Sequence, residues 1–477
     1  MKNNYLYIII IVFAIFNIKS YAQVGVGTTT PDASAMLDIS STTKGLLAPR
    51  MTTIEKNGIT SPAVGLLIYD TDLDKFNYFD GASWVILEAG TNISRTNYKL
   101  VKSVADLADE LAAGGGTTYL LNSTYLYEIN GTVLLNFPID INEAYIKGQD
   151  TREDILFNNT GTSLFSGSKG GNIRDLLIVG NGQPAFNISA SASESLIVNS
   201  VIFTGCSSIG SLSNLGLVFF NITQFINCTV GLSVSNITSF LMSNVFWEST
   251  NTGTFLNFSG TFNAIQLNSG RVSVDSGEIG IDVSSNPTVN NAGSIIGVEF
   301  TGAGTRVNGY TAGSYTGYKF SNQWEVSSPG LLVETDNNST GTIYVSTKAT
   351  TSIPAASSPV KALGTTTPVN LFRFDTGGAT NNRLRYIGKK SRIFNVSASL
   401  SITSTSNNQI LSLYIAKNGT VLNSTKIQRK IGTGADIGAT GLTGTVQLNT
   451  GDYIELFVSS DIAARDATIE NLNFHIN

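Results

Sequence analysis

Histidine and charge are the scarcest features of this chain. The sequence of 477 residues has one histidine and only 13% charged residues, so it cannot supply a zinc site or a histidine-based catalytic triad. Its formal net charge is −5, and a negative chain lacks the basic face that neutralises a nucleic-acid backbone. We therefore expect no nucleic acid as a partner, and no motif indicates a cofactor or a metal.

Long apolar runs are also few. One extends from Tyr5 to Phe16, after Lys2 and before the small-x-small sequence Ser20-Tyr21-Ala22. About a dozen apolar residues fall short of the roughly 20 that span a bilayer, so we predict that residues 1–22 are a cleaved secretory signal peptide. Loss of its two lysines leaves a mature charge of about −7. The mature chain is expected to be secreted or at the cell surface, with no membrane span.

Glycine, serine, threonine and asparagine are abundant instead. The 47 glycines and the low charge are typical of a protein with many strands and turns rather than of a disordered or helix-rich chain. We predict an all-β fold. The length indicates roughly two to four domains.

The first expected domain covers residues 23–90. Short apolar strands alternate with Gly, Thr and Pro, and residues 66–69 and 76–79 are spaced as a hairpin. The strings GVGTTTPDASAMLDIS, GLLAPRMT, SPAVGLLIYDTD and FDGASW resemble an N-terminal module found in front of many exported and fibre proteins of Bacteroidota and their phages. The resemblance implies an attachment module in a surface or fibre context, and it implies no activity.

The second expected domain, residues 97–320, has the rhythm of a parallel β-helix. Apolar, β-branched clusters centred on Ile178, Ile202, Phe225, Phe246, Ser273 and Glu299 follow one another at intervals of 24, 23, 21, 27 and 26 residues. Such intervals match the rungs of a right-handed, pectate-lyase-like β-helix better than the 8 to 12 residues of a sandwich. A β-sandwich with fortuitous spacing is the alternative. Residues 103–112 are predicted to form a helix that caps the first rung.

The two cysteines fall at equivalent places of consecutive rungs. Cys206 follows Phe203 by three residues, and Cys228 follows Phe225 by three. Stacked strands are about 4.8 Å apart, which allows either a disulfide or a ladder of buried thiols. We favour the ladder.

A Thr-, Ser- and Pro-rich stretch at residues 321–368 is predicted to be a neck or linker. Residues 369–477 then alternate apolar and polar positions with period two, which indicates a sandwich. The strings SLYIAKNGTV, TVQLNTGDYIELFVSS and NLNFHI resemble the jelly-roll heads of the complement and tumour-necrosis-factor type. Members of that family usually trimerise, so the resemblance implies a homotrimer.

Few residues in the sequence indicate a catalytic site. Glycoside hydrolysis needs two carboxylates roughly 5 to 10 Å apart, and the best candidates are Asp275, Glu278 and Asp282. Acids in such turns are more often solvated turn residues. Pectate-lyase-like and tailspike β-helices are often enzymes, yet no motif of theirs matches.

A second candidate site is an aromatic cluster near the end of the β-helix. Tyr310, Tyr315, Tyr318 and Trp324 could stack on sugars, or they could pack the lower cap against the neck. The favoured function is adhesion or receptor binding to a surface glycan or protein by a multivalent head. A polysaccharide-degrading spike and a passive structural component are the alternatives, and a virion fibre is a possible setting.

Overall fold

The computed structural model describes residues 23–87 and 96–477, so the predicted signal peptide lies outside the described residues. The chain divides into two compact units between residues 95 and 96. Within the described ranges, no helix has the length and apolar character needed to cross a membrane.

The N-terminal unit is a small, mostly β structure. Its elements are β1 (Val24–Val26), β2 (Leu37–Ile39), β3 (Arg50–Met51), α2 (Thr53–Asn57), β4 (Leu67–Asp70), β5 (Lys75–Phe79) and β6 (Trp84–Ile86). Strands β4 and β5 pair antiparallel, which confirms the predicted hairpin. The Lys56 ammonium lies 2.7 Å from the Asp70 carboxylate, and both side chains are buried.

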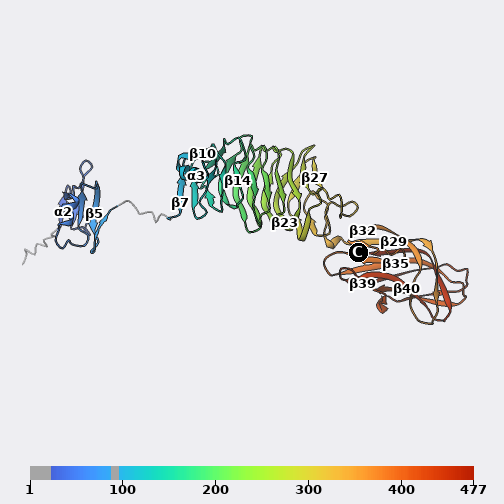
Figure 1. Ribbon diagram of the computed structural model, residues 1–477. Helices are drawn as coiled ribbons and strands as arrows, with labels where there is room; N and C mark the ends of the chain where they lie inside the picture. The colour runs from blue at the N-terminus through green and yellow to red at the C-terminus, as the bar shows by residue number, and fades with distance from the viewer. Residues whose placement is uncertain (1–22, 88–95) are drawn as a thin grey trace, which may run out of the picture. The chain divides into compact units, whose positions relative to one another are not determined.

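The second unit begins with a parallel β-helix, here called the shaft, in which strands stack rung upon rung (Figure 1). Its rungs have three faces. Face 1 contains β7 (Tyr98–Val101), β9 (Leu126–Ile129), β12 (Tyr145–Lys147), β25 (Thr288–Ile296), β28 (Trp324–Ser327) and the first halves of β15 (Gly171–Val179), β17 (Ser195–Thr204), β19 (Leu217–Ile226), β21 (Ser239–Trp247) and β23 (Thr261–Ser273). The second halves of those five long strands form face 2 with β10 (Thr132–Leu135), β13 (Ile155–Asn158) and β26 (Glu299–Thr301).

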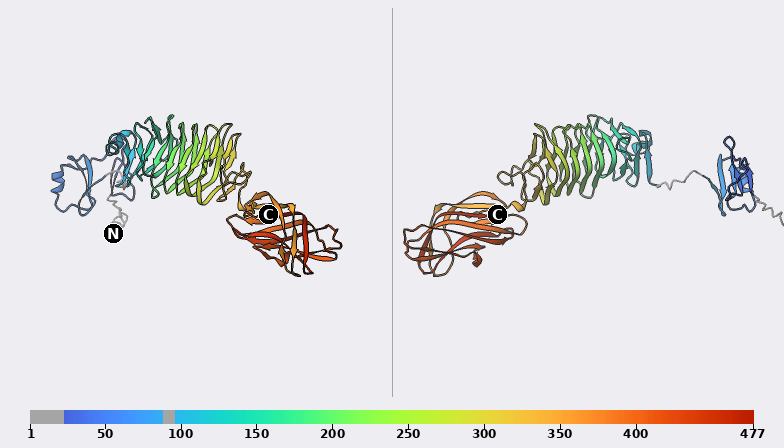
Figure 2. Two further views of the ribbon diagram at one scale, coloured as in Figure 1. Left: turned by 45° about the vertical axis from the view of Figure 1, so that its right-hand side comes forward. Right: turned by 180° about the vertical axis from the view of Figure 1, so that it is seen from behind.

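Face 3 is a separate nine-stranded parallel sheet. It consists of β8 (Tyr119–Leu120), β11 (Ile139–Asp140), β14 (Phe165–Gly167), β16 (Phe186–Ser189), β18 (Gly210–Ser213), β20 (Leu232–Ser235), β22 (Thr254–Ser259), β24 (Ile279–Asp282) and β27 (Thr305–Asn308). Figure 2 shows the same stack from two further sides. The predicted all-β fold with a parallel β-helix is confirmed.

Each long strand turns from face 1 to face 2 at one residue with a left-handed backbone. These residues are Asp175, Ser200, Ile222, Asn244 and Ser269, with φ between 49° and 58°. Their neighbours pair in register from rung to rung, so the corners stack. Asn, Asp and Ser tolerate this conformation by bonding to their own backbone, whereas a β-branched residue is strained there. Ile222 is the exception in the column.

The shaft core is a set of apolar ladders. Phe203 stacks on Phe225 with centroids 5.3 Å apart, and Trp247 packs against Phe225 at 5.9 Å. Because the sheet period is two, each inward ladder leaves an equal set of side chains facing out. The inward column through Ile178 and Phe203 continues to Phe225, Trp247, Val272 and Phe300.

A short helical segment closes the first rung, as predicted. It consists of the 3-10 turn η1 (Val104–Leu107) and α3 (Ala108–Ala113). The Asp106 carboxylate accepts the Ser103 backbone N–H at 2.9 Å. Leu107 is buried in the shaft core, and the buried Glu110 carboxylate receives the Lys99 ammonium and the Tyr127 hydroxyl.

The C-terminal part, here called the head, has two antiparallel sheets around its own core. The first runs β32-β29-β41-β35-β39 and the second β33-β34-β40-β36-β37. Their strands are β29 (Thr340–Lys348), β30 (Thr350–Ile353), β31 (Val360–Lys361), β32 (Gly364–Phe372), β33 (Phe374–Asp375), β34 (Leu384–Tyr386), β35 (Arg392–Thr403), β36 (Gln409–Lys417), β37 (Thr420–Val421), β38 (Ile427–Ile431), β39 (Gly438–Leu448), β40 (Tyr453–Ser460) and β41 (Arg465–Ile476). Two 3-10 turns, η2 (Asp336–Asn338) and η3 (Asn423–Thr425), complete it.

The predicted neck at residues 321–368 is wrong for most of its length. Strand β28 is the last rung of face 1, and β29 to β32 are strands of the head sheets. Ile343 and Ile353 alternate with polar residues and are fully buried in the head core. Threonine suits a pleated, half-buried strand, and Pro368 is accommodated because β32 is an edge strand.

A buried ion pair lies where shaft and head meet within the second unit. Arg373 Nε is 3.2 Å from Asp336 Oδ1, and both side chains are at most 2% exposed. Arg373 also donates from Nη2 to the Trp324 carbonyl at 3.1 Å. The Asp336 carboxylate accepts the backbone N–H groups of Lys389 and Lys390.

Candidate functional site

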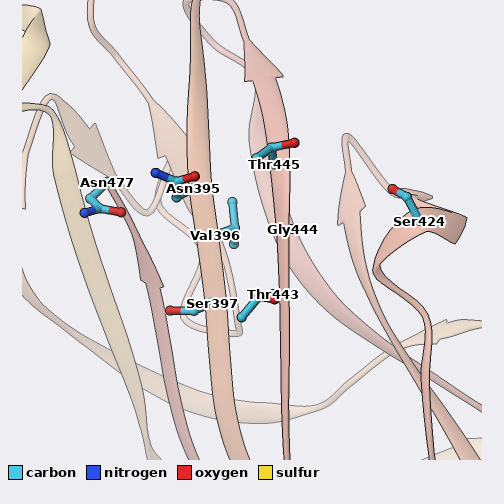
Figure 3. Close-up of a pocket in the computed structure, with 8 residues that line it drawn as sticks. All are labelled: Asn395, Val396, Ser397, Ser424, Thr443, Gly444, Thr445 and Asn477. Carbon is cyan, nitrogen blue, oxygen red and sulfur yellow. The ribbon is translucent and has the colours of Figure 1, made fainter.

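The head has a shallow cavity of about 460 Å³ on the sheet that contains β35 and β39. Figure 3 shows the residues that line it. They are Asn395, Val396, Ser397, Ser424, Thr443, Gly444, Thr445 and Asn477. Six of the eight residues have amide or hydroxyl side chains, and none of the lining side chains is ionisable.

The strand register positions the lining residues. Val396 pairs with Gly444 on one side and with Ile476 on the other, and this row faces the core side of the sheet, opposite to the outward Asn395, Ser397, Thr443 and Thr445. A Cβ at Gly444 would lie 2.5 Å from Thr425 Cγ2, because the turn η3 packs against that point. Asn395 faces Thr445 and Ser397 faces Thr443 across the same strand pair, which places polar groups on both rims. The side chains that line the cavity are therefore uncharged and offer many hydrogen-bonding groups.

A second cavity of about 320 Å³ lies at the last rungs of the shaft. Arg306 and Lys319 line it together with the buried Glu334. Arg306 Nη1 donates to the Gly330 carbonyl at 2.7 Å, and both Glu334 oxygens accept backbone N–H groups of residues 319 and 320. These polar groups hold the last rungs of the shaft together through hydrogen bonds to the backbone. We therefore assign them a structural role.

The three acidic candidates do not form an open pair. Glu278 Oε2 accepts the Asp275 backbone N–H at 2.6 Å, and Glu278 is only 9% exposed. Asp282 accepts from the Ser284 backbone at 2.9 Å and from the Asn308 amide at 3.1 Å. Partial burial of Asp282 raises its pKa, but these hydrogen bonds outweigh burial and lower it. Asp282 therefore stays ionised, which does not suit a general acid.

The aromatic candidates pack inside the protein rather than facing a ligand. Trp324 is fully buried and donates its indole N–H to the Tyr310 hydroxyl at 3.0 Å. Tyr318 stacks on Phe372 of the head with centroids 4.0 Å apart, and Tyr315 meets the same ring edge-on at 5.3 Å. Of the two interpretations, these contacts agree with packing: the four aromatics join the end of the shaft to the head.

Cys206 and Cys228 are free and buried. The Cys228 thiol donates to the Ile226 carbonyl at 3.4 Å. The interaction with the Cys228 thiol, together with burial, raises the pKa of Cys206, and the same interaction lowers the pKa of Cys228. Both side chains are buried and belong to the core of the shaft.

The outward side of face 3 is a ladder of small polar residues that sequence reasoning did not single out. Its members are Ser166, Asn187, Ser211, Ser233 and Asn257 in one column and Ser189, Ser213, Ser235 and Ser259 in the next. Within a rung pair, the Ser211 hydroxyl donates to Asn187 Oδ1 at 3.3 Å. No charged side chain interrupts these two columns between residues 166 and 259. Period-two alternation marked these positions as outward, but only the register reveals that they stack.

The comparison with protein families yields one match. Residues 25–98 match the family described as "Phage tail like trimerisation region". This match includes the β1–β6 unit and reaches the first strand of the shaft. No curated protein matches the chain in sequence.

Several solved structures are similar in part. Tailspike protein 4 of bacteriophage CBA120, enzymatically active domain, is 9% identical over 90% of this chain and 77% of its own, with a TM-score of 0.21. Tailspike protein gp49 of the Acinetobacter baumannii bacteriophage Fri1, a capsular polysaccharide depolymerase, is 7% identical over 90% and 98%, with a TM-score of 0.23. Murine APRIL is 10% identical over 29% and 98%, with a TM-score of 0.19. At these TM-scores the likenesses contribute nothing to the argument that follows.

Proposed function

We propose that this chain is the subunit of an exported or virion-borne homotrimeric fibre that binds a neutral surface glycan through its jelly-roll-like head. The observation that supports it most is the trimerisation-region match at residues 25–98 in front of a β-helical shaft. An assembly with three heads gains avidity from weak individual contacts. Shallow contacts are then sufficient for attachment.

The head cavity supports the choice of a neutral glycan. Asn395, Ser397, Thr443 and Thr445 offer amide and hydroxyl groups on the outward side of the β35–β39 strand pair. Sugar hydroxyl groups both donate and accept hydrogen bonds, as these side chains do. A ligand with a formal charge has no side-chain counter-ion among the residues that line this cavity.

Glycan-array binding of the full chain tests the proposal, together with the mass of the assembly in solution. We expect a trimer that binds neutral glycans. Thr443→Trp fills the cavity and should weaken binding at least tenfold. Ala439→Trp is the matched control, because Ala439 is exposed on the same strand and face but does not line the cavity.

Equal binding by both variants would contradict the head cavity as the binding site. A monomeric chain would contradict the fibre. Product analysis of the same samples addresses the alternative of polysaccharide cleavage. Cleavage that Asp275→Ala or Asp282→Asn abolishes would overturn the non-catalytic part of the proposal.

A further inference from the structure

The three faces of the shaft differ in what they present to the outside. Face 3 presents the Ser and Asn ladder described above. Face 1 mixes apolar residues with charged and amide residues, including Glu128, Lys147, Arg174, Asn199 and Asn221. Face 2 presents a continuous apolar surface over five rungs. Its outward residues from β10 to β19 are Thr132, Leu134, Ile155, Phe157, Leu177, Val179, Ile202, Thr204, Gln224 and Ile226.

Seven of those ten are aliphatic or aromatic, and none is charged. We call Leu134, Ile155, Phe157, Leu177, Val179, Ile202 and Ile226 the apolar stripe of face 2. Leu134 is 48% exposed, and the others are partly exposed because their stacked neighbours cover them. A contiguous apolar surface on a soluble protein is typical of an interaction site. On the two other faces, the same rungs carry polar or charged groups that interrupt such a surface.

The stripe ends within the shaft. In the next rungs the corresponding positions of face 2 carry Phe246 and Glu248, then Arg271 and Ser273, then Glu299 and Thr301, so each of these rungs has a charged residue. Arg271 pairs with Glu248 at 2.8 Å, and Gln224 donates to the same carboxylate at 3.2 Å. The apolar stripe is thus confined to the N-terminal half of the shaft.

That half directly follows the region matched to a trimerisation family. The match ends at residue 98, and the first strand of the shaft begins at Tyr98. Copies joined in parallel at residues 25–98 begin their shafts together, and in a three-fold ring a face turned towards the symmetry axis is the one on which all copies meet through equivalent residues. We propose that a second copy of this chain covers the apolar stripe of face 2, so that the N-terminal rungs of the shaft belong to the trimer contact. This inference rests on the proposed trimeric fibre.

The size of the stripe limits its role. Five rungs about 4.8 Å apart and about four residues wide give a surface on the order of 250 Å² per copy. A stable interface buries roughly 800 Å² per partner, so the stripe alone does not hold two copies together. It adds to an association that the N-terminal region establishes through its high effective concentration.

Cysteine cross-linking in the full chain tests this contact. Ile155→Cys places a thiol on the stripe, and Ser233→Cys places one on face 3 at a comparable exposed strand position. The wild-type chain controls for Cys206 and Cys228, which are buried. Under mild oxidation we expect disulfide-linked pairs at least tenfold more abundant for Ile155→Cys than for Ser233→Cys.

A second variant removes the apolar contact without touching the core. Leu177→Glu in the Ile155→Cys background should reduce cross-linking at least tenfold. Phe219→Glu, an outward residue of face 1, should leave it unchanged. The inference is overturned if Ser233→Cys cross-links as well as Ile155→Cys does, or if Leu177→Glu has no effect. The mass of the wild-type assembly is measured separately. A trimer in which Ile155→Cys does not cross-link contradicts the proposed contact at face 2. A monomer contradicts the proposed function itself.

Discussion

The shaft and the head are both built from strands, but they are held together over very different distances along the chain. In the shaft, Phe203 pairs with Phe225, and each rung touches the next one 19 to 31 residues later. In the head, Thr342 pairs with His475 across 133 residues. A stack of neighbours behaves as a sum of local units, whereas long-range pairing makes the head one cooperative unit. We therefore expect a destabilising substitution in the shaft to unfold only the neighbouring rungs. A similar substitution in the head should destabilise the whole head.

The largest expected effect comes from core truncation. Trp247→Ala in the shaft and Phe474→Ala in the head each remove a fully buried aromatic ring and should cost about 3–5 kcal/mol of local stability. We expect native-state hydrogen exchange to show lost protection only around β19 to β23 in the first variant. In the second variant, both head sheets should lose protection together. Uniform loss from β8 to β27 in the Trp247 variant would break the comparison.

The junction between the two parts should respond almost as strongly. Arg373→Ala leaves Asp336 buried without its cation, and removal of one partner of a buried pair costs about 3–5 kcal/mol. The double variant Arg373→Met/Asp336→Leu removes both charges and should cost clearly less. Urea unfolding of the single and double variants measures the difference. A double variant less stable than Arg373→Ala would contradict this account of the pair.

Acid should separate the two parts further. Burial raises the pKa of Asp452, but hydrogen bonds from Lys417, Asn449 and Asn418 outweigh it and lower the pKa. The hydrogen bonds from Lys348 and Thr403 lower the pKa of Glu470. Groups whose pKa is lower in the folded state stabilise the fold above their unfolded pKa of about 4, and this stabilisation is lost as pH falls below it.

The middle rungs of the shaft lack such groups, because residues 196–266 contain one charged residue, Glu248. Brief pepsin digestion after incubation at pH 3 should therefore release peptides from the head before peptides from these rungs. After incubation at pH 6 instead, the same brief digestion with pepsin should release peptides from the head and from these rungs at equal rates. Earlier release of the middle rungs would show that the lowered pKa values do not control acid stability.

The smallest expected effect lies at the corner between face 1 and face 2. Ile222 is β-branched, yet its φ is 49°. Ile222→Asn should stabilise the shaft by about 1 kcal/mol, because Asn tolerates the left-handed conformation. Asn244→Ile, one rung further, is the matched control and should destabilise by a similar amount. The midpoint of urea unfolding measures both, and a lower midpoint for Ile222→Asn would contradict the corner strain.

The difference between shaft and head also explains what could be predicted from sequence. Local repetition revealed the β-helix, the capping segment and the equivalence of Cys206 and Cys228, since each depends on residues close in the chain. The rung lengths were less accurate, because Ile178 stacks on Phe203 rather than on Ile202. The predicted neck failed for the opposite reason. Its threonines form strands only because β41, more than 100 residues later, supplies their partner.

The candidate site was also only partly predictable, because it depends on contacts between distant segments. Period-two alternation in residues 369–477 indicated that polar positions face outward, but only the pairing of β35 with β39 brings Asn395 beside Thr445 and Ser397 beside Thr443. The sequence left open whether Trp324 lies in a surface patch or packs against the neck, since an isolated aromatic cluster does not reveal what packs on it. Phe372 and Arg373, which cover that cluster, come from the head. Positions on a face were predictable, and contacts between distant segments were not.

The serine and asparagine ladder of face 3 has a consequence for the medium in which such a fibre operates. A surface without fixed charges exerts no long-range field, so dissolved ions have little to screen. Encounters on that side depend on short-range hydrogen bonding and shape alone. Contacts made by these two columns should therefore depend little on salt, whereas the net negative charge of the chain acts from its other parts.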